Sequence, residues 1–431
     1  MSIKKAVAYL MCITMAAGLT GCGSDEESCS YSSTAAPIEG ESFDAYESSA
    51  DEADDGLDGS AAEDIAESPE AAPEQGVVHE EIDNSDKIGV LTAGEWNDND
   101  NWGFFRNLIS SGTITLPEYC FDVTRRIKVE ITDGAGTPLP NVTAVLVDKD
   151  GNLVWSAVSG KDGAAYLFYP DTEPQELDFV NVVSGEASQQ LPIEMNEQGD
   201  DGGQEDEQTS AINETMQAVL ETPESLYEKM QVMFILDTTG SMGDEMLFLQ
   251  SEFGSIAEAV GSDNIEYSVN FYRDKGDEYV TKCNPFTSDT AEISACLNAE
   301  IATGGGDHPE AVAEILTETL ADTQWDSEAV KVAFLIFDAP PHSGTKSELD
   351  RAIHAASEQG IHVVPVVSSN SDRYTEIFAR VLAVATNGTY VFLTDDSGVG
   401  GSHLEPIIGD YQVELLRDII IRLIDDYRQV K

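Results

Sequence analysis

From about residue 227 to its end, the chain alternates short apolar runs with longer segments in which apolar residues recur every three or four positions. The runs predict buried strands, and the periodic segments predict helices. The predicted strands are Val232–Leu236 and residues 265–274, 330–338, 361–369 and 389–394. The predicted helices are Glu245–Val260, residues 288–302, Pro309–Ala321, Leu349–Glu358, Tyr374–Thr386 and Gln412–Tyr427. Apolar strands separated by helices indicate a Rossmann-like α/β domain, with a doubly wound, mostly parallel sheet covered on both faces.

Residues 119–195 follow a different pattern, in which short β-type runs are separated by turn sequences. The turns "DGAG", "DKDG" and "GKDG" predict a small antiparallel β-sandwich. Asp133, Asp148 and Asp162 stand beside glycines there, which favours turn formation over calcium binding. The stretch from Gly136 to Val145, followed by "DKDG", resembles carboxypeptidase regulatory-like and bacterial immunoglobulin-like modules. This resemblance implies a module that acts as a spacer or as a recognition domain.

Two polar segments flank the sandwich. Residues 89–118 include "NDNDN", where an EF-hand loop beginning at Asp98 would need oxygen ligands at Trp102 and Ile109. Neither residue supplies one, so we expect a polar turn between buried aromatic residues. Residues 196–226 are acidic and glycine-rich, and we expect them to be a linker.

The N-terminus has the pattern of an export signal. In residues 1–21, two lysines precede an apolar segment that is too short to span a bilayer permanently. The segment ends in "LTGC", which resembles a bacterial lipobox and implies acylation of Cys22; an ordinary cleaved signal is the alternative. Acyl chains would anchor the protein to a membrane of a bacterial cell envelope, facing the periplasm or the exterior.

The acidic residues of the chain are unevenly distributed. Residues 22–88 are rich in Ser, Ala, Pro and acid, with too few apolar residues to offset the entropy of ordering. We expect this segment to be a disordered tether. The 431-residue chain has a net charge of −59, which excludes binding to nucleic acid or to an anionic membrane surface through charge.

Chemistry-bearing residues follow the first predicted strand of the α/β domain. The strand ends at Asp237, and hydroxyls follow at Thr239 and Ser241; a later strand ends at Asp338. Ligand sites of parallel sheets lie at the carboxyl ends of the strands. Oxygen donors are the ligands that Mg²⁺ prefers. Capping of the following helix is the alternative role for these residues.

The same residues carry a family resemblance, covering roughly residues 227–431. "DTTGSM" resembles the Asp-x-Ser-x-Ser signature of the metal-ion-dependent adhesion site of von Willebrand factor A domains, with Thr239 replacing the first serine. "FLIFDAPPH" places Asp338 at the last metal-site aspartate. "ATGGGDHPEA" falls at a glycine loop that carries a threonine in the family; either Thr303 or Asp307 could serve, and Asp307 is favoured because it follows the glycines.

The resemblance implies Mg²⁺, or Ca²⁺ or Mn²⁺ in its place, and a protein ligand whose acidic side chain completes the metal shell. If Asp307 replaces the threonine, the added charge should hold the metal more firmly and weaken binding of a partner carboxylate. The predicted function is therefore that of a membrane-anchored, metal-dependent, adhesion-type lipoprotein. An envelope assembly or structural factor whose domain docks a partner is the alternative.

Catalytic motifs are few. The sequence contains no Walker lysine loop, no "HExxH" and no "GxSxG", and the "SGTK" at Ser343 lacks the companion motifs of penicillin-binding proteins. His308 and His342 lie near the predicted metal site, either supporting it or as ordinary loop residues. We expect no enzymatic activity.

The cysteines suggest one disulfide. In an exported protein, Cys283 and Cys296 are the most plausible pair because they lie close in sequence. Pairing of Cys29 with Cys120 is only an alternative. No CxxC motif occurs, so we do not expect metal binding by thiols.

Overall fold

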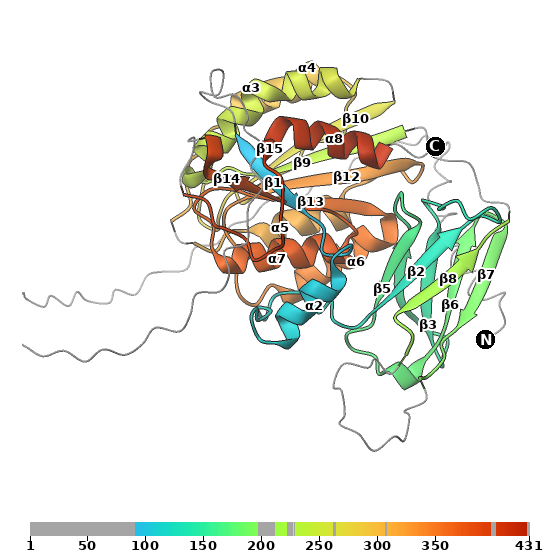
Figure 1. Ribbon diagram of the computed structural model, residues 1–431. Coiled ribbons are helices and arrows are strands. Elements are labelled where there is room, and N and C mark those ends of the chain that lie inside the picture. Colours follow the sequence, from blue (N-terminus) through green and yellow to red (C-terminus); the bar gives the residue numbers. More distant parts are fainter. Residues whose placement is uncertain are drawn as a thin grey trace, which may run out of the picture. The chain divides into compact units, whose positions relative to one another are not determined.

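An eight-stranded, mostly parallel sheet forms the centre of the C-terminal half of the protein (Figure 1). The computed structural model describes residues 91–196, 212–221, 227, 229–261, 264–306, 308–397 and 402–428, all within one unit. The strand order is β11-β10-β9-β12-β13-β14-β1-β15. Five parallel neighbours make up most of it: β9 (Lys229–Asp237), β10 (Ile265–Tyr272), β12 (Ala329–Phe337), β13 (Ile361–Val367) and β14 (Tyr390–Thr394). The predicted fold class is confirmed.

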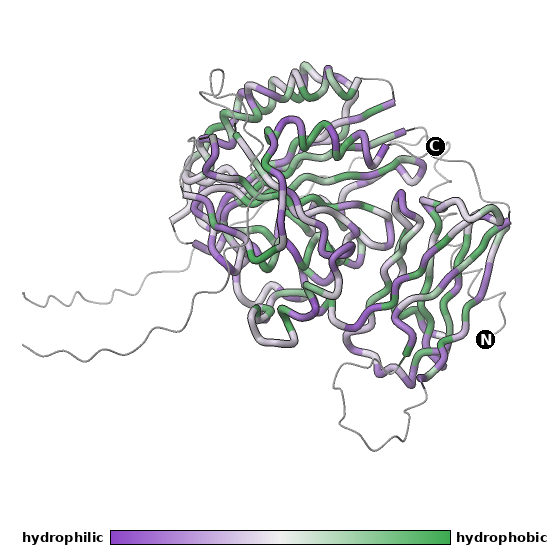
Figure 2. The backbone as a smooth tube through the Cα atoms, viewed as in Figure 1, coloured by the Kyte–Doolittle hydropathy of each residue, from purple (hydrophilic) through white to green (hydrophobic). Residues whose placement is uncertain are grey.

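Helices cover both faces of this sheet, and each face has its own apolar core (Figure 1). One face packs against α3 (Gly243–Val260), α4 (Thr290–Ala299) and α8 (Leu416–Arg428). The other packs against α5 (Val312–Leu316), the π-turn η4 (Thr317–Asp322), α6 (Lys346–Gln359) and α7 (Arg373–Ala385). Figure 2 shows hydrophobic residues concentrated along the strands. The central strands are continuously buried, as strands covered on both faces must be.

The edge strands come from unexpected parts of the chain. β1 (Thr92–Trp96) pairs antiparallel with both β14 and β15 (Glu414–Leu415), and β11 (Thr281–Lys282) is an antiparallel edge beside β10. We expected only a polar turn in residues 89–118. A side chain at Gly94 would place its Cβ 2.5 Å from the Phe392 ring, so glycine permits this pairing. The short, partly polar "TAGEW" gave no strand pattern.

The aspartate-rich turn after β1 is partly buried. Asp98 is 4% exposed and accepts a hydrogen bond from Trp96 Nε1 at 2.9 Å, and the next helix is α2 (Trp102–Ser110). Phe105 is buried, but Phe104 is exposed. The expected polar turn is therefore present, with only part of its aromatic flank buried.

Residues 126–219 form two facing sheets. One has the order β5-β2-β8 and the other β4-β3-β6-β7. The strands are β2 (Arg126–Thr132), β3 (Thr143–Asp148), β4 (Leu153–Val158), β5 (Ala164–Phe168), β6 (Leu177–Ser184), β7 (Ala187–Pro192) and β8 (Thr215–Val219). β8 pairs parallel with β2, so the module is not purely antiparallel, and part of the expected linker is a strand. The short helical turns η2 (Pro174–Glu176), η3 (Gly240–Met242) and η5 (Asp395–Ser397) complete the assignment.

The turn aspartates of this module serve local structure, as predicted. Asp133 Oδ1 accepts hydrogen bonds from the backbone N–H groups of Ala135 and Thr137, both at 2.8 Å. Asp148 Oδ1 accepts one from Asn152 at 2.7 Å, and Asp162 Oδ1 accepts one from Ala164. Each carboxylate thus closes its own turn.

The predicted disulfide between Cys283 and Cys296 is wrong in this structure, where both residues and Cys120 are free thiols. Cys283 Sγ donates to Glu318 Oε2 at 3.3 Å, on the face covered by η4. Cys296 lies on α4 and packs against the core of the opposite face. The two thiols are therefore separated by the sheet despite their closeness in sequence.

Several predicted features fall outside the described residues. They are the signal of residues 1–21, Cys22, Cys29, the tether of residues 22–88 and Asp307. Within the described part of the chain, no helix combines the length and apolar character required to cross a bilayer.

Candidate metal centre

Two neighbouring strands each end at an aspartate. Asp237 is the last residue of β9, and Asp338 follows β12 directly. The two strands are parallel and in register, with Ile336 opposite Leu236. The carboxyl ends of β9 and β12 therefore bring both predicted aspartates to the same edge of the sheet.

The loop after β9 orients two hydroxyls toward this edge. Asp237 Oδ1 accepts hydrogen bonds from the backbone N–H of Thr239 at 2.8 Å and from Thr239 Oγ1 at 2.7 Å. Thr239 Oγ1 lies 3.4 Å from the hydroxyl of Ser241. Neither η3 nor α3 has a side-chain hydrogen bond at its N-cap, so these hydroxyls do not serve as a helix cap. The capping alternative is wrong.

Burial makes the two aspartates poor acids. Asp237 is 1% exposed, and its Oδ2 has no hydrogen-bond partner among the described residues. Burial, and then the neighbouring Asp338, raise its pKa to about 7, although the bonds from Thr239 oppose this shift. Burial also raises the pKa of Asp338, against the effect of Ser241 and His308. Both groups are held where a negative charge is costly without a cation.

A third carboxylate lies at the site and was missed from the sequence. Glu310 is 4% exposed, its backbone N–H donates to Pro340 O at 3.0 Å, and its Oε2 has no hydrogen-bond partner in the described ranges. Burial, then Asp237 and other aspartates, raise its pKa to about 9. Glu310 falls in the predicted helix Pro309–Ala321, and no role was predicted for it from the sequence; the polar loop preceding it was the only available signal.

The glycine loop lies directly against the residues after β9. Thr303 N–H donates to Thr238 O at 2.9 Å, and Gly240 N–H donates to Gly304 O at 3.2 Å. Gly304 and Gly305 have φ values of +86° and +73°, a region that favours glycine. The side chain of Thr303 is exposed. The loop is thus fixed through its backbone.

Both histidines near the site contact carboxylates. His342 Nε2 lies 2.6 Å from Oδ1 of Asp274, which is 5% exposed. His308 Nε2 lies 3.1 Å from Oδ2 of Asp372, the N-cap residue of α7. Each histidine is therefore in contact with an acidic residue that is not among the candidate metal ligands.

This donor set fits a hard divalent cation. It offers buried carboxylate oxygens without partners, together with two hydroxyls, and Mg²⁺ and Ca²⁺ are bound through oxygen. Across the described ranges, no three His, Cys, Asp or Glu side chains converge to form a metal cage. Hydroxyls and water would therefore have to supply much of the shell.

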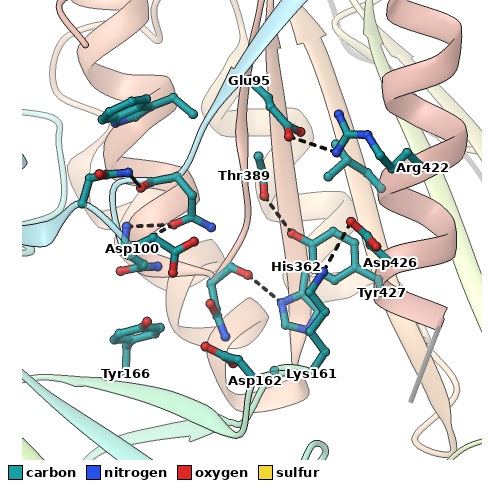
Figure 3. A pocket seen from close by; sticks show the side chains of 17 residues that line it. Glu95, Asp100, Lys161, Asp162, Tyr166, His362, Thr389, Arg422, Asp426 and Tyr427 are labelled. Atoms are coloured by element: carbon teal, nitrogen blue, oxygen red, sulfur yellow. Dashed lines mark hydrogen bonds and ion pairs between the residues drawn. The ribbon is translucent and has the colours of Figure 1, made fainter. Parts of the chain in front are cut away.

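A cavity of the described part of the chain lies elsewhere. It has a volume of about 360 Å³ and is lined by His362 and Thr389 at the amino ends of β13 and β14, the opposite end of the strands from Asp237 (Figure 3). Its basic residues are paired: Lys161 with Asp426 at 3.4 Å, and Arg422 with Glu95 at 2.9 Å. It is separate from the candidate metal centre.

Comparison with known proteins finds a family match for part of the chain. Residues 231–402 match the von Willebrand factor A domain family. The match begins within β9 and extends beyond β14, and so includes Asp237, Glu310 and Asp338. A crystal structure titled conserved hypothetical protein BatB, from Bacteroides thetaiotaomicron, is 16% identical, with a TM-score of 0.34, and the alignment covers 46% of this chain and 98% of that one. No curated protein matches the chain.

Proposed function

We propose that the protein binds a protein ligand through a divalent metal ion held at the carboxyl ends of β9 and β12. The observation that carries the proposal is the pair of buried aspartates, Asp237 and Asp338, beside the hydroxyls of Thr239 and Ser241. A von Willebrand factor A domain in residues 231–402 supports an interaction role of the adhesion type.

The residues have distinct roles in this proposal. Thr239 and Ser241 bind the ion directly, and Asp237 and Asp338 bind it directly or through water. Asp307 or Thr303 completes the set. Mg²⁺ is the preferred ion, with Ca²⁺ or Mn²⁺ as substitutes, because it binds oxygen and retains several waters. A position left to water can then accept an oxygen from the partner, such as an acidic side chain.

Thermal unfolding of the full chain tests the metal site. An ion that binds only the folded state raises the free energy of unfolding by about 2.7 kcal/mol when the free ion concentration is one hundred times the Kd. Mg²⁺ should therefore raise the Tm and a chelator should reverse the rise. Asp237→Ala should abolish the shift, whereas Asp244→Ala, an exposed neighbour on α3, should retain it. Absence of any divalent-ion binding by the wild type at millimolar concentration would overturn the proposal.

The same measurement distinguishes the two candidates in the glycine loop. Metal titrations of Asp307→Ala and Thr303→Ala should differ, and the variant with the larger loss of affinity identifies the ligand. If both bind as the wild type does, neither residue contributes.

The proposed location is a bacterial cell envelope, through a lipid on Cys22. The support is the "LTGC" sequence that follows the apolar segment. Cys22→Ser should release the protein from membranes into a soluble or uncleaved form. Continued flotation of this variant with membranes at high salt would contradict lipid anchoring.

A further inference from the structure

Glu310 is a buried acid at the site to which the proposed function assigns no role. It lies just before α5, and its backbone N–H is held by Pro340 O, two residues after Asp338. This contact and a parallel bridge to Pro341 tie Glu310 to the segment that carries Asp338. Its position is therefore fixed by the same backbone that positions a proposed metal ligand.

Gly305 shows how close Glu310 comes to Thr239. A Cβ placed on Gly305 would lie 3.1 Å from Glu310 Oε1 and 3.1 Å from Thr239 Cβ. The Glu310 carboxylate and the Thr239 side chain therefore both lie close to Gly305, whose φ of +73° favours glycine. Glu310 thus lies beside the loop whose hydroxyls would bind the ion.

In the described ranges, no lysine or arginine forms an ion pair with Glu310. The charges that act on it most strongly are those of Asp237, Asp274, Asp338 and Asp277, all of them acidic. Its Oε2 is buried and has no hydrogen-bond partner among the described residues, as is also true of Asp237 Oδ2. Unpaired buried carboxylates are costly, so two such oxygens facing one site point to a cation between them.

We propose that Glu310 is an internal carboxylate of the metal centre, bound to the water shell of the ion and competing with an acidic group of the partner. This inference rests on the proposed metal-dependent function. Contact through water follows from the absence of three converging acidic side chains in the described ranges, and Mg²⁺ keeps several of its waters.

With Glu310 included, the site should bind the metal ion more strongly and a partner carboxylate more weakly. Asp237, Asp338 and Glu310 together carry more negative charge than one divalent ion neutralises. The filled site therefore attracts a further carboxylate weakly, while it holds the metal firmly. Neutralising Glu310 should reverse both properties, giving weaker metal binding and stronger carboxylate binding.

Isothermal titration of MgCl₂ into the full chain tests the first property. Glu310→Gln keeps the shape of the side chain and removes the charge, and loss of such an outer contact lowers metal affinity by about 10- to 100-fold. Glu314→Gln is the matched control, because Glu314 lies four residues further along and pairs with Lys275 at 2.7 Å. The control should bind Mg²⁺ as the wild type does.

Acetate titrated into Mg²⁺-saturated protein tests the second property. Acetate should bind more tightly to Glu310→Gln than to the wild type or to Glu314→Gln. Unchanged Mg²⁺ and acetate affinities in Glu310→Gln, with normal Mg²⁺ binding by the wild type, would overturn the role of Glu310 and leave the proposed function intact. Failure of the wild type to bind Mg²⁺ would instead overturn the proposed function.

A folding defect is separated from a binding defect by melting the variants in chelator. In chelator at pH 7, Glu310→Gln should melt close to the wild type, because burial raises the pKa of Glu310 to about 9 and the protonated carboxyl is uncharged, as the amide is. A variant that melts as the wild type does without metal and still binds Mg²⁺ normally would count against the proposal.

Discussion

Two regions of the α/β domain that bury carboxylates differ in whether a basic side chain pairs with them. On α7, Arg380 is 0% exposed and binds Asp98 through two nitrogens, at 2.7 and 2.8 Å. Arg380 also pairs with Glu376 at 3.1 Å. At the ends of β9 and β12, Asp237, Asp338 and Glu310 are about as deeply buried, yet no lysine or arginine pairs with them in the described ranges.

The difference teaches how to interpret a buried acid. Desolvation penalises both sets of carboxylates, and the guanidinium of Arg380 offsets the penalty in the first. In the second, the penalty remains and is visible in the raised pKa of Asp237 and of Glu310. The paired cluster joins α7 to the turn after β1 and is structural. The unpaired cluster is the one to which we assign the proposed metal ion.

The largest expected effect comes from breaking the paired cluster. Arg380→Met would leave Asp98 and Glu376 buried without their partner, and loss of one member of a buried ion pair costs about 3–5 kcal/mol. Denaturant unfolding of the full chain measures this loss. Arg351→Met is the control, because its pair with Asp322 is exposed and should contribute less than about 1 kcal/mol.

Similar stability of Arg380→Met and the wild type would mean that the paired cluster contributes little. The contrast between the two regions would then lose its energetic basis.

Removing a charge from the unpaired cluster should instead increase the stability of the metal-free protein. In chelator at pH 8, Asp237→Asn should raise the free energy of unfolding by about 1–2 kcal/mol, because it removes a buried charge that has no cation. The amide keeps the oxygen that accepts the two hydrogen bonds from Thr239. With Mg²⁺ added, the wild type should gain stability and the variant should not. A loss of stability in chelator would show that the charge of Asp237 is already compensated within the protein.

The sequence predicted the sheet well because its strands are covered on both faces. Runs such as residues 332–337 are apolar throughout, and that pattern is recognisable without knowledge of tertiary contacts. β1 and β8 were missed because each is a short strand of mixed polarity, which forms only where a neighbouring strand is available. The disulfide prediction failed for a related reason: separation along the chain says nothing about which face of a sheet a residue occupies.

The site was only partly predictable. The topology of a parallel sheet brings the carboxyl ends of its strands together. Four of the candidates lie at or just after such ends: Asp237, Thr239, Ser241 and Asp338. Glu310 follows no strand, and its place depends on a backbone contact with Pro340 that no local pattern encodes. The sequence pattern therefore identified the candidates at or directly after strand ends and missed the one whose position depends on a contact with a distant loop.

A buried lysine extends the comparison of buried charges to a positively charged group. Lys331 is 5% exposed, and its ammonium donates to two backbone carbonyls, those of Ala329 and Gln359, both at 3.1 Å. Burial lowers its pKa to about 8, while Asp326 acts in the other direction. Between about pH 8 and the ordinary lysine value, the unfolded chain binds more protons than the folded one. The contribution of Lys331 to stability should therefore rise with pH in this window.

Lys331→Met isolates this contribution. Below pH 8 the variant should be more stable than the wild type by about 1–2 kcal/mol, and the advantage should shrink as the pH rises toward 10.5. Denaturant unfolding of both proteins at several pH values measures this difference in stability. Other titrating groups are common to both proteins, so their contributions cancel. A difference that does not change with pH would mean that Lys331 titrates alike in the folded and unfolded chains.

The smallest expected effect concerns a buried contact without charge, between the sandwich and α6. Trp155 Nε1 donates to Ser357 Oγ at 2.9 Å, and that hydroxyl is placed to donate to Ser156 O at 3.1 Å. Ser357→Ala leaves the indole N–H unpaired and should lower the free energy of unfolding by about 1 kcal/mol, well below the loss in Arg380→Met. Ser255→Ala, on the exposed side of α3, should be nearly neutral in the same denaturant titration. A loss in Ser357→Ala as large as that in Arg380→Met would show that hydrogen bonding alone accounts for the stability assigned to buried charge pairing.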